Sequence, residues 1–458
     1  MQNTVRSIWA LFVGIALLML GNGLQGSLLA VRANIEGFPT NLIGFVMSTY
    51  YLGFLISSIV TPRFISGVGH IRVFAAFASL ASTTILLHSL FPTPVSWMAL
   101  RFVTGIAVAG LYVVCESWLN QVTTNEERGK VFSIYMMVVS AFMGLGQFIL
   151  PLADPSGHVL FIVVSILVSL ALVPISLSRA PAPTVLALER MSIGTLYAYS
   201  PLGVVGCFLI GIAQGAFISM SPLYATEIGL NPGEVALFLS LPFAAVLVVQ
   251  FPLGALSDRV DRRRVITFVS VIAGVAAALM LEQSSEFMIY LLYGVFAACA
   301  MTLYGLTIAH ANDNLPSELI LPASAMLVLV FSIGSFGGPI LAGLAMAAMG
   351  PSALFMLCAA VHVVIAVFAV YRMTRRGAVP ASEKTGYAPI ASRATGLAAA
   401  TIAEAAMETY QENYEATLAD DDEDAASTGE TGGSEPQPNE LPETGTETGQ
   451  GGQPVDRP

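Results

Sequence analysis

Long apolar segments with very few charged residues dominate the first 377 residues of this 458-residue chain. A helix needs about 20 apolar residues to cross the hydrocarbon core of a bilayer, because it rises about 1.5 Å per residue. The apolar segments are continuous rather than alternating, so we predict membrane-spanning helices and not a barrel of strands. Twelve spans are expected, at residues 8–31, 42–62, 73–91, 97–119, 131–151, 159–178, 201–225, 234–254, 265–282, 287–309, 323–349 and 352–371.

The charge of the chain is divided between two regions. Only 11% of all residues are charged, whereas soluble proteins have about a quarter. From Ala378 to Pro458 there are 16 acidic and 3 basic residues. The formal net charge of -11 therefore belongs to the C-terminal segment, and the apolar region before it is slightly basic.

The basic residues of the short loops predict the orientation, because Lys and Arg are retained on the cytoplasmic side. With the N-terminus in the cytoplasm, 14 of them fall on that side, and only Arg32 lies in an external loop. An even number of spans then places the C-terminus in the cytoplasm as well. The first apolar segment has the length of a span and lacks a small-residue cleavage site, so we expect it to remain as the first helix.

The spans divide into two similar sets of six. Gln25 precedes Pro62 by about the same distance as Gln214 precedes Pro252, and each pair is followed by a basic turn. Such internal repeats are common in transporters. We therefore expect four regions, which are an N-terminal half at 1–178, a cytoplasmic connecting loop at 179–200, a C-terminal half at 201–376, and an acidic, mostly disordered cytoplasmic tail at 377–458.

The turn Gly254-Ala-Leu-Ser-Asp258-Arg259-Val-Asp-Arg262-Arg-Arg264 closely resembles the G-x-L-a-D-r-x-G-R-r loop signature of the major facilitator superfamily, and it lies between the eighth and ninth spans. The resemblance covers residues 1 to about 376. It implies the superfamily fold of two pseudo-symmetric six-helix halves, and secondary transport in which the halves rock around a central site. The corresponding first-half turn, which ends at Arg72, lacks the Asp and the basic cluster, so a gate built from it is expected to be asymmetric.

Charged residues inside a span are costly in hydrocarbon and are the first candidates for function. Arg101 either faces a carboxylate or an anionic substrate, or extends to the external interface beside Trp97. Glu116 lies near the cytoplasmic end of the same span. It either carries a proton or forms an ion pair with Arg63 or Arg72, and we favour the pair.

Uncharged polar residues of the spans are candidates to line the substrate cavity. Each can bind a ligand, or instead bond a neighbouring helix. The resemblance places the first, fourth, seventh and tenth helices around the cavity. With Arg101, this favours Asn22, Gln25 and Gln214 as cavity residues, and Gln147 and Tyr304 are weaker candidates.

The basic turn is interpreted as a cytoplasmic gate. The resemblance implies that Asp258 packs against a helix of the other half, near Arg128, and releases it when the transporter changes state. The alternative is that the arginines only fix the topology. The gate candidates are Gly254, Asp258, Arg259, Arg262, Glu116 and Arg72, and a bend that helps a half to move is expected at Gly338 and Pro339.

Several classes of chemistry lack their motifs. The spans and loops contain a single lysine, Lys130, without the glycines of a phosphate-binding loop, and the five histidines have no metal-ligand spacing. We therefore expect no cofactor, no metal, no enzymatic activity and no nucleic-acid partner.

The C-terminal segment is expected to be mostly solvated, with a helix predicted at 397–419 and followed by the acidic run Asp420-Asp-Asp-Glu-Asp424. A cytoplasmic partner of this tail is the alternative to a dispensable extension.

Together these features predict a transporter of the bacterial inner membrane that moves a small, largely apolar or monoanionic solute by alternating access, with protons as the expected coupling ion. The bacterial assignment comes from the resemblance. The competing hypothesis is a non-transporting sensor or assembly protein with the same fold, which acts through its tail.

Overall fold

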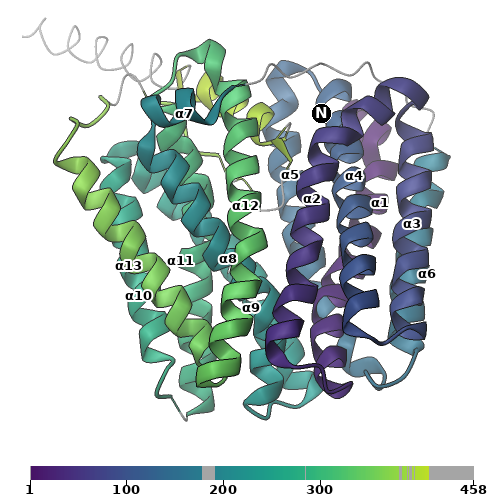
Figure 1. The fold of residues 1–458 in the computed structure, drawn as a ribbon. Coiled ribbons are helices and arrows are strands. Elements are labelled where there is room, and N and C mark those ends of the chain that lie inside the picture. The colour runs from purple at the N-terminus through teal and green to yellow at the C-terminus, as the bar shows by residue number, and fades with distance from the viewer. Residues whose placement is uncertain are drawn as a thin grey trace, which may run out of the picture. The chain divides into compact units, whose positions relative to one another are not determined.

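In a computed structural model of the chain, the described residues are 2–177, 191–283, 285–380, 384–388, 390, 395–396 and 398–411. This part of the chain is helical and contains no β-strand, which confirms the predicted class. The helices of Figure 1 are α1 Gln2–Ile35, α2 Thr40–Val68, α3 His70–Leu90, α4 Pro94–Val122, α5 Asn125–Gln147, a 3-10 turn η1 Leu150–Leu152, α6 Val159–Ser176, α7 Ile193–Tyr199, α8 Pro201–Glu227, α9 Pro232–Arg259, α10 Arg262–Leu279, α11 Glu286–Asn312, α12 Ser317–Met349 and α13 Ala353–Met373.

Within the described residues, 11 helices are long and apolar enough to cross a membrane. Helix α10 has 18 residues and carries three arginines in its first turn. It corresponds to the ninth predicted span, so the structure has a helix for each of the predicted segments. Helix α7 is too short to span and lies in the predicted connecting loop, of which residues 178–190 are outside the described part.

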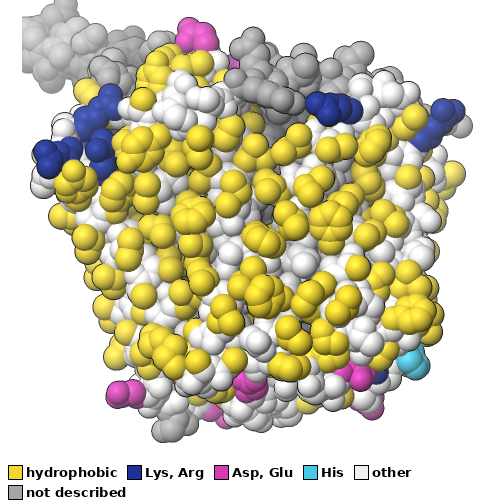
Figure 2. Space-filling view, in the orientation of Figure 1, with side chains coloured by type: hydrophobic (Ala, Val, Ile, Leu, Met, Phe, Trp, Pro, Cys, Tyr) yellow, Lys and Arg dark blue, Asp and Glu magenta, His cyan; other side chains and the backbone are white. Residues whose placement is uncertain are grey.

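The surface has the pattern of a protein embedded in a bilayer. Figure 2 shows apolar side chains over the middle of the molecule, with Lys and Arg mainly along the upper rim and most Asp and Glu along the lower rim. Large apolar residues such as Val248, Phe268 and Val367 are exposed in mid-helix. We call the upper rim, where α1 begins and α13 ends, the basic end, and the opposite rim the acidic end.

Close helix packing depends on small residues. Helices α8 and α12 approach so closely that a Cβ atom on Gly211, Gly215, Gly334 or Gly338 would collide with the backbone of the partner helix. These four glycines therefore serve the close packing of α8 against α12. A Cβ atom on Gly53 of α2 or Gly105 of α4 would likewise collide with the backbone of the other helix. Glycines therefore permit close helix packing in both parts of the chain.

Helices α1–α6 and α8–α13 form two groups (Figure 1). Side-chain hydrogen bonds between the groups lie toward the acidic end in the described structure. They join Asn34 to Thr226 and Thr40 to Glu227 near the rim, and Tyr51 to Ser219 deeper in the bundle. The two groups are thus joined directly at the acidic end.

The described residues of the C-terminal segment differ from the solvated extension that the sequence predicts. Ala398, Ala399 and Ala400 are completely buried, and the stretch from Ala398 to Gln411 is helical. Apolar content is low here, but small side chains fit against the bundle without large apolar area. The rest of the predicted helix and the acidic run lie outside the described residues.

Candidate functional site

A cavity lies between the two helix groups, in the middle part of α5, α8, α9 and α11. Its lining is largely apolar, and the flexible methionines can adapt to different shapes. Ser140 and Gln250 supply its polar groups. The lining residues are Met136, Val139, Ser140, Met143, Ile218, Phe243, Val246, Gln250, Met301 and Ile390.

The predicted polar candidates do not line this cavity, but three of them gather beside it on α1 and α5. Gln147 donates from Nε2 to the carbonyl oxygen of Gly23, at 3.0 Å; Gly23 follows Asn22 directly and lies two residues before Gln25. Nδ2 of Asn22, Nε2 of Gln25 and Oε1 of Gln147 are buried without a hydrogen-bond partner. A buried polar atom without a hydrogen-bond partner raises the free energy of the folded state. These three atoms would therefore gain from a hydrogen bond to a ligand or to water.

Gln214 and Tyr304 form the corresponding pair in the second group. Gln214 of α8 donates to the carbonyl oxygen of Ala300 on α11 at 2.8 Å, and Tyr304 lies one turn further along α11 against Phe331. Oε1 of Gln214 and the hydroxyl of Tyr304 are buried without a partner. Each helix group thus presents unpartnered polar atoms from its interior.

Arg101 is buried and does not extend to the interface. Its guanidinium lies 4.5 Å from the centre of the Tyr50 ring, and the side chain is 5% exposed. Such a cation–π contact is favourable where water is excluded. The neighbouring Trp97 is also buried and donates to the carbonyl oxygen of His88, so the predicted interfacial alternative does not apply.

Glu116 is completely buried, and its partners differ from the predicted ones. Its carboxylate accepts hydrogen bonds from the hydroxyl of Tyr135 at 3.0 Å and from the amide and hydroxyl of Thr395. Arg72 is exposed to solvent. The favoured ion pair with Arg63 or Arg72 is therefore not formed, because donors from α5 and from the C-terminal segment occupy the carboxylate.

The predicted gate loop forms a buried charge cluster around Arg262. This guanidinium contacts Asp258 at 2.8 Å and Asp313, which directly follows α11, at 2.6 Å, and its side chain is 1% exposed. Asp258 also accepts a hydrogen bond from the amide of Tyr387. Asp258 thus contacts its own loop and the C-terminal segment instead of Arg128, while Arg259 is exposed.

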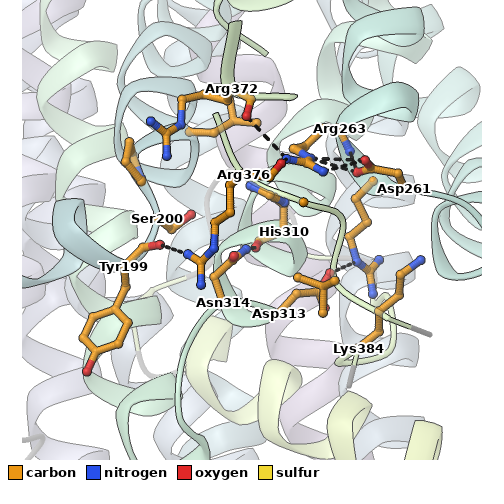
Figure 3. A pocket seen from close by; sticks show the side chains of 15 residues that line it. Tyr199, Ser200, Asp261, Arg263, His310, Asp313, Asn314, Arg372, Arg376 and Lys384 are labelled. Atoms are coloured by element: carbon orange, nitrogen blue, oxygen red, sulfur yellow. Dashed lines mark hydrogen bonds and ion pairs between the residues drawn. The ribbon is translucent and has the colours of Figure 1, made fainter. Parts of the chain in front are cut away.

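A second charge pair begins α10. Asp261 caps the helix by accepting from the amide of Arg263 and forms an ion pair with its guanidinium at 2.7 Å. Burial opposes ionisation of Asp261, but the bonds from Arg263 leave the pKa of this carboxyl below its ordinary value. Figure 3 shows Arg263 also reaching the carbonyl oxygens of Arg372 and Arg376, which ties α10 to the end of α13.

Lys384 completes this end of the site from the C-terminal segment. Its ammonium group donates to the carbonyl oxygens of Ser257, Asp258 and Val260 at the end of α9, where a cation is favoured by the helix dipole. Burial and the nearby Arg262 lower the pKa of Lys384. These contacts also account for Gly254, since a Cβ atom there would overlap the ring of Tyr387.

Gly338 and Pro339 lie inside the continuous helix α12. Gly338 packs against α8, and the carbonyl oxygen of Pro339 faces Gly44 of α2. The predicted bend residues are thus located where α12 meets both helix groups.

Other site residues give weak or no sequence signals. Gln250 is an amide within a span and meets the same criterion as Gln214. Met136, Met143 and Met301 are indistinguishable from packing residues by sequence. Asp313 follows a span, and Thr395 lies in a segment of ordinary polar composition, so their partners follow only from the fold. Among the described residues, no group of three His, Cys, Asp or Glu side chains could hold a metal ion.

Known proteins that resemble this chain are transporters. It is 27% identical over 368 residues to an uncharacterized MFS-type transporter, YcaD, of Salmonella typhimurium, covering 79% of this chain and 94% of the relative. The YcaD protein of Escherichia fergusonii is 26% identical over 366 residues, with the same coverage.

Solved structures share the fold. A crystal structure of the nucleoside transporter NupG aligns with a TM-score of 0.65 at 14% identity, over 80% of this chain and 99% of that one. An inward-facing bacterial homolog of the human lysosomal transporter Spinster aligns with a TM-score of 0.64 at 13% identity, over 89% and 98%.

The Major Facilitator Superfamily model matches residues 11–231 and 203–407, which together include almost all of the helical region. This agrees with the loop signature at Gly254–Arg264 and with the two helix groups around a central cavity. The chain is a multi-pass membrane protein and a member of the Major Facilitator Superfamily of transporters.

Proposed function

We propose that this protein is a secondary active transporter that carries a small, largely apolar or monoanionic solute by alternating access. The observation that carries this proposal is the position of the apolar cavity, which lies between the two helix groups. A site at that place is exposed to opposite sides of the membrane when the groups rock. Regions 1–178 and 201–376 are the proposed halves.

The lining indicates the class of solute. Eight of the ten lining residues are apolar, and Ser140 and Gln250 offer hydrogen bonds. Highly charged solutes would lose their hydration without compensation. The unpartnered atoms of Asn22, Gln25 and Gln214 are the proposed polar anchors, reached when the halves rearrange, and Arg101 is the proposed anchor for a monoanion.

Protons are the proposed coupling ion, and Glu116 is the proposed carrier. Glu116 is the only Asp or Glu of the described spans that is buried as a whole residue. The free energy of ionising a buried carboxyl group depends on the hydrogen bonds that the group accepts. Tyr135 supplies a donor from the neighbouring helix.

The proposed location is a bacterial inner membrane, with the basic end in the cytoplasm. The relatives are bacterial proteins, and the positive-inside rule places the Lys- and Arg-rich rim on the cytoplasmic side. Both termini would then be cytoplasmic.

An uptake screen tests the function. A deletion strain is compared with its parent for the uptake of small apolar and monoanionic solutes, and any solute that differs is then tested in vesicles that contain the purified protein. Accumulation driven by a pH gradient is expected. Binding without flux would instead favour the second candidate, a sensor that acts through its C-terminal segment, for which the burial of Thr395 and of Ala398 to Ala400 is the supporting observation.

A further inference from the structure

The C-terminal segment occupies the space between the helix groups at the basic end (Figure 1, yellow-green). Thr395 is 2% exposed, and residues Ala398 to Ala400 are completely buried. This burial is not expected for a solvated extension, so the segment has a specific position in the bundle.

The first anchor of the segment is on the second helix group. Lys384 bonds the carbonyl oxygens at the end of α9, and Thr385 donates from its amide to Asp313 at 2.8 Å. Tyr387 donates its amide to Asp258 and lays its ring against Gly254 and Gly305. The gate loop of the second group therefore binds the chain's own C-terminal segment.

The second anchor is on the first helix group. Thr395 bonds the buried carboxylate of Glu116 through its amide, at 3.1 Å, and through its hydroxyl. Further along, Ala405 lies against α5, where a Cβ atom on Gly129 would be 3.6 Å from the Cβ of Ala405.

The segment connects the two groups within two residues. Thr395 contacts α4, while a Cβ atom on the next residue, Gly396, would lie 3.0 Å from Ala325 of α12. The described side-chain hydrogen bonds that join the groups directly are toward the acidic end. At the basic end, the connection is made through this segment.

Ile390 extends the same segment into the central cavity, where it forms part of the lining. The segment is therefore a wall of the cavity on its basic side. A solute in the cavity could leave toward the basic end only after this segment moved, and the groups could not close on each other there while it was in place.

We propose that the C-terminal segment, through its described residues 384–388, 390, 395–396 and 398–411, is an autoinhibitory segment that closes the basic-end opening and holds the halves apart until it is released. This inference rests on the proposed transport function. The segment belongs to the same chain as the opening that it closes. It binds a surface formed by Asp258, Asp313, Glu116 and Ala325. Release of the segment is then a point of regulation of the transporter.

A cysteine placed in the cavity tests the proposal without any substrate. Ser140→Cys lines the cavity, and the four native cysteines are buried. In inside-out vesicles, a membrane-impermeant maleimide should modify Ser140→Cys slowly in the full chain. Adding Thr395→Val should increase the labelling rate about tenfold or more, because the buried carboxylate of Glu116 loses the hydrogen bond from the Thr395 hydroxyl.

Matched variants control for general effects of these changes. Thr409→Val alters an exposed threonine of the same segment, which bonds only its own helix, and should leave the rate unchanged. Lys384→Met should increase the rate, whereas Lys130→Met, at an exposed lysine of α5, should not. Equal rates in all these variants would overturn the proposal.

A reversible cross-link separates docking from misfolding. Cysteines at Gly129 and Ala405 would have the Cβ separation of a disulfide. In the Thr395→Val, Ser140→Cys background, oxidation should return the labelling to the slow rate and reduction should restore the fast rate in the same molecules. Failure of the disulfide to form in the chain that keeps Thr395 would refute the docked position, and a disulfide that leaves the rate unchanged in the Thr395→Val background would refute the closure. Absence of solute flux in every variant would count against the transport function and leave the labelling result intact.

Discussion

Gly44 of α2 and Gly343 of α12 face each other across the two helix groups, and a Cβ atom on Gly44 would lie 3.0 Å from Cα of Gly343. A Cβ atom on Gly343 would in turn lie 3.0 Å from the carbonyl oxygen of Thr40. The contact is backbone against backbone, so neither side can yield by rotating a side chain. It forms part of the direct contact between the groups on the acidic side.

Substitution Gly343→Ala should force the groups apart at the acidic end. Overpacking of a tight contact costs about 1–3 kcal/mol, so we expect a lower melting temperature. Thermal unfolding in detergent measures this loss. Gly337→Ala is the matched control in the same helix, because a Cβ atom there meets nothing within 4 Å. Equal melting temperatures for the two variants would contradict the packing described.

Substitution Arg262→Met should destabilise the basic end strongly. It leaves the carboxylates of Asp258 and Asp313 without their cation, and the side chain of Asp313 is 2% exposed. Breaking a buried pair costs about 3–5 kcal/mol. Thermal unfolding should show a large decrease, while Arg259→Met, at an exposed position of the same loop, should change the melting temperature little. A similar effect of both would mean that the cluster does not contribute as described.

Substitution Glu116→Gln should separate coupling from transport. An amide has nearly the shape of the carboxyl group but carries no titratable proton, so accumulation driven by a pH gradient should be lost and solute exchange at equal pH should persist. Counterflow in vesicles measures the exchange. Glu282→Gln, at an exposed glutamate, is the control. Accumulation by Glu116→Gln at the unmodified rate would exclude Glu116 as the proton carrier.

Substitution Arg101→Met should reduce the transport of a monoanionic solute and leave the fold intact. Methionine keeps much of the buried side-chain volume over Tyr50 but removes the charge. We expect an increase in KM of about tenfold or more, which corresponds to about 1.4 kcal/mol. Initial uptake rates at several solute concentrations measure it, with an unchanged melting temperature as the control. Unchanged kinetics would remove Arg101 from the site.

The sequence predicts the helices well because hydropathy and length are local properties. Each predicted span corresponds to an observed helix, although α10 begins at Arg262, three residues earlier than predicted, because Asp261 caps it. Gly211 with Gly215 and Gly334 with Gly338 are also a local signal, since small residues at four-residue spacing permit close approach of helices.

The partners of the charged residues were less predictable. Charge alone suggested Arg63 or Arg72 for Glu116, but its donors come from Tyr135 and from Thr395, which is 279 residues away. The buried C-terminal segment was missed for the same reason. Its Ala and Thr residues give no strong apolar signal, and its position depends on matching backbone groups and small side chains of the bundle.

The central claim is that the cavity is exposed alternately to the two sides of the membrane. Labelling of Ser140→Cys by an impermeant maleimide tests it directly, in right-side-out and inside-out vesicles that contain the Thr395→Val variant. Alternating access predicts that the cysteine reacts from both sides, while the vesicles remain sealed to the reagent. Reaction from the basic side alone, at any incubation time, would contradict alternating access and favour a membrane protein that does not transport.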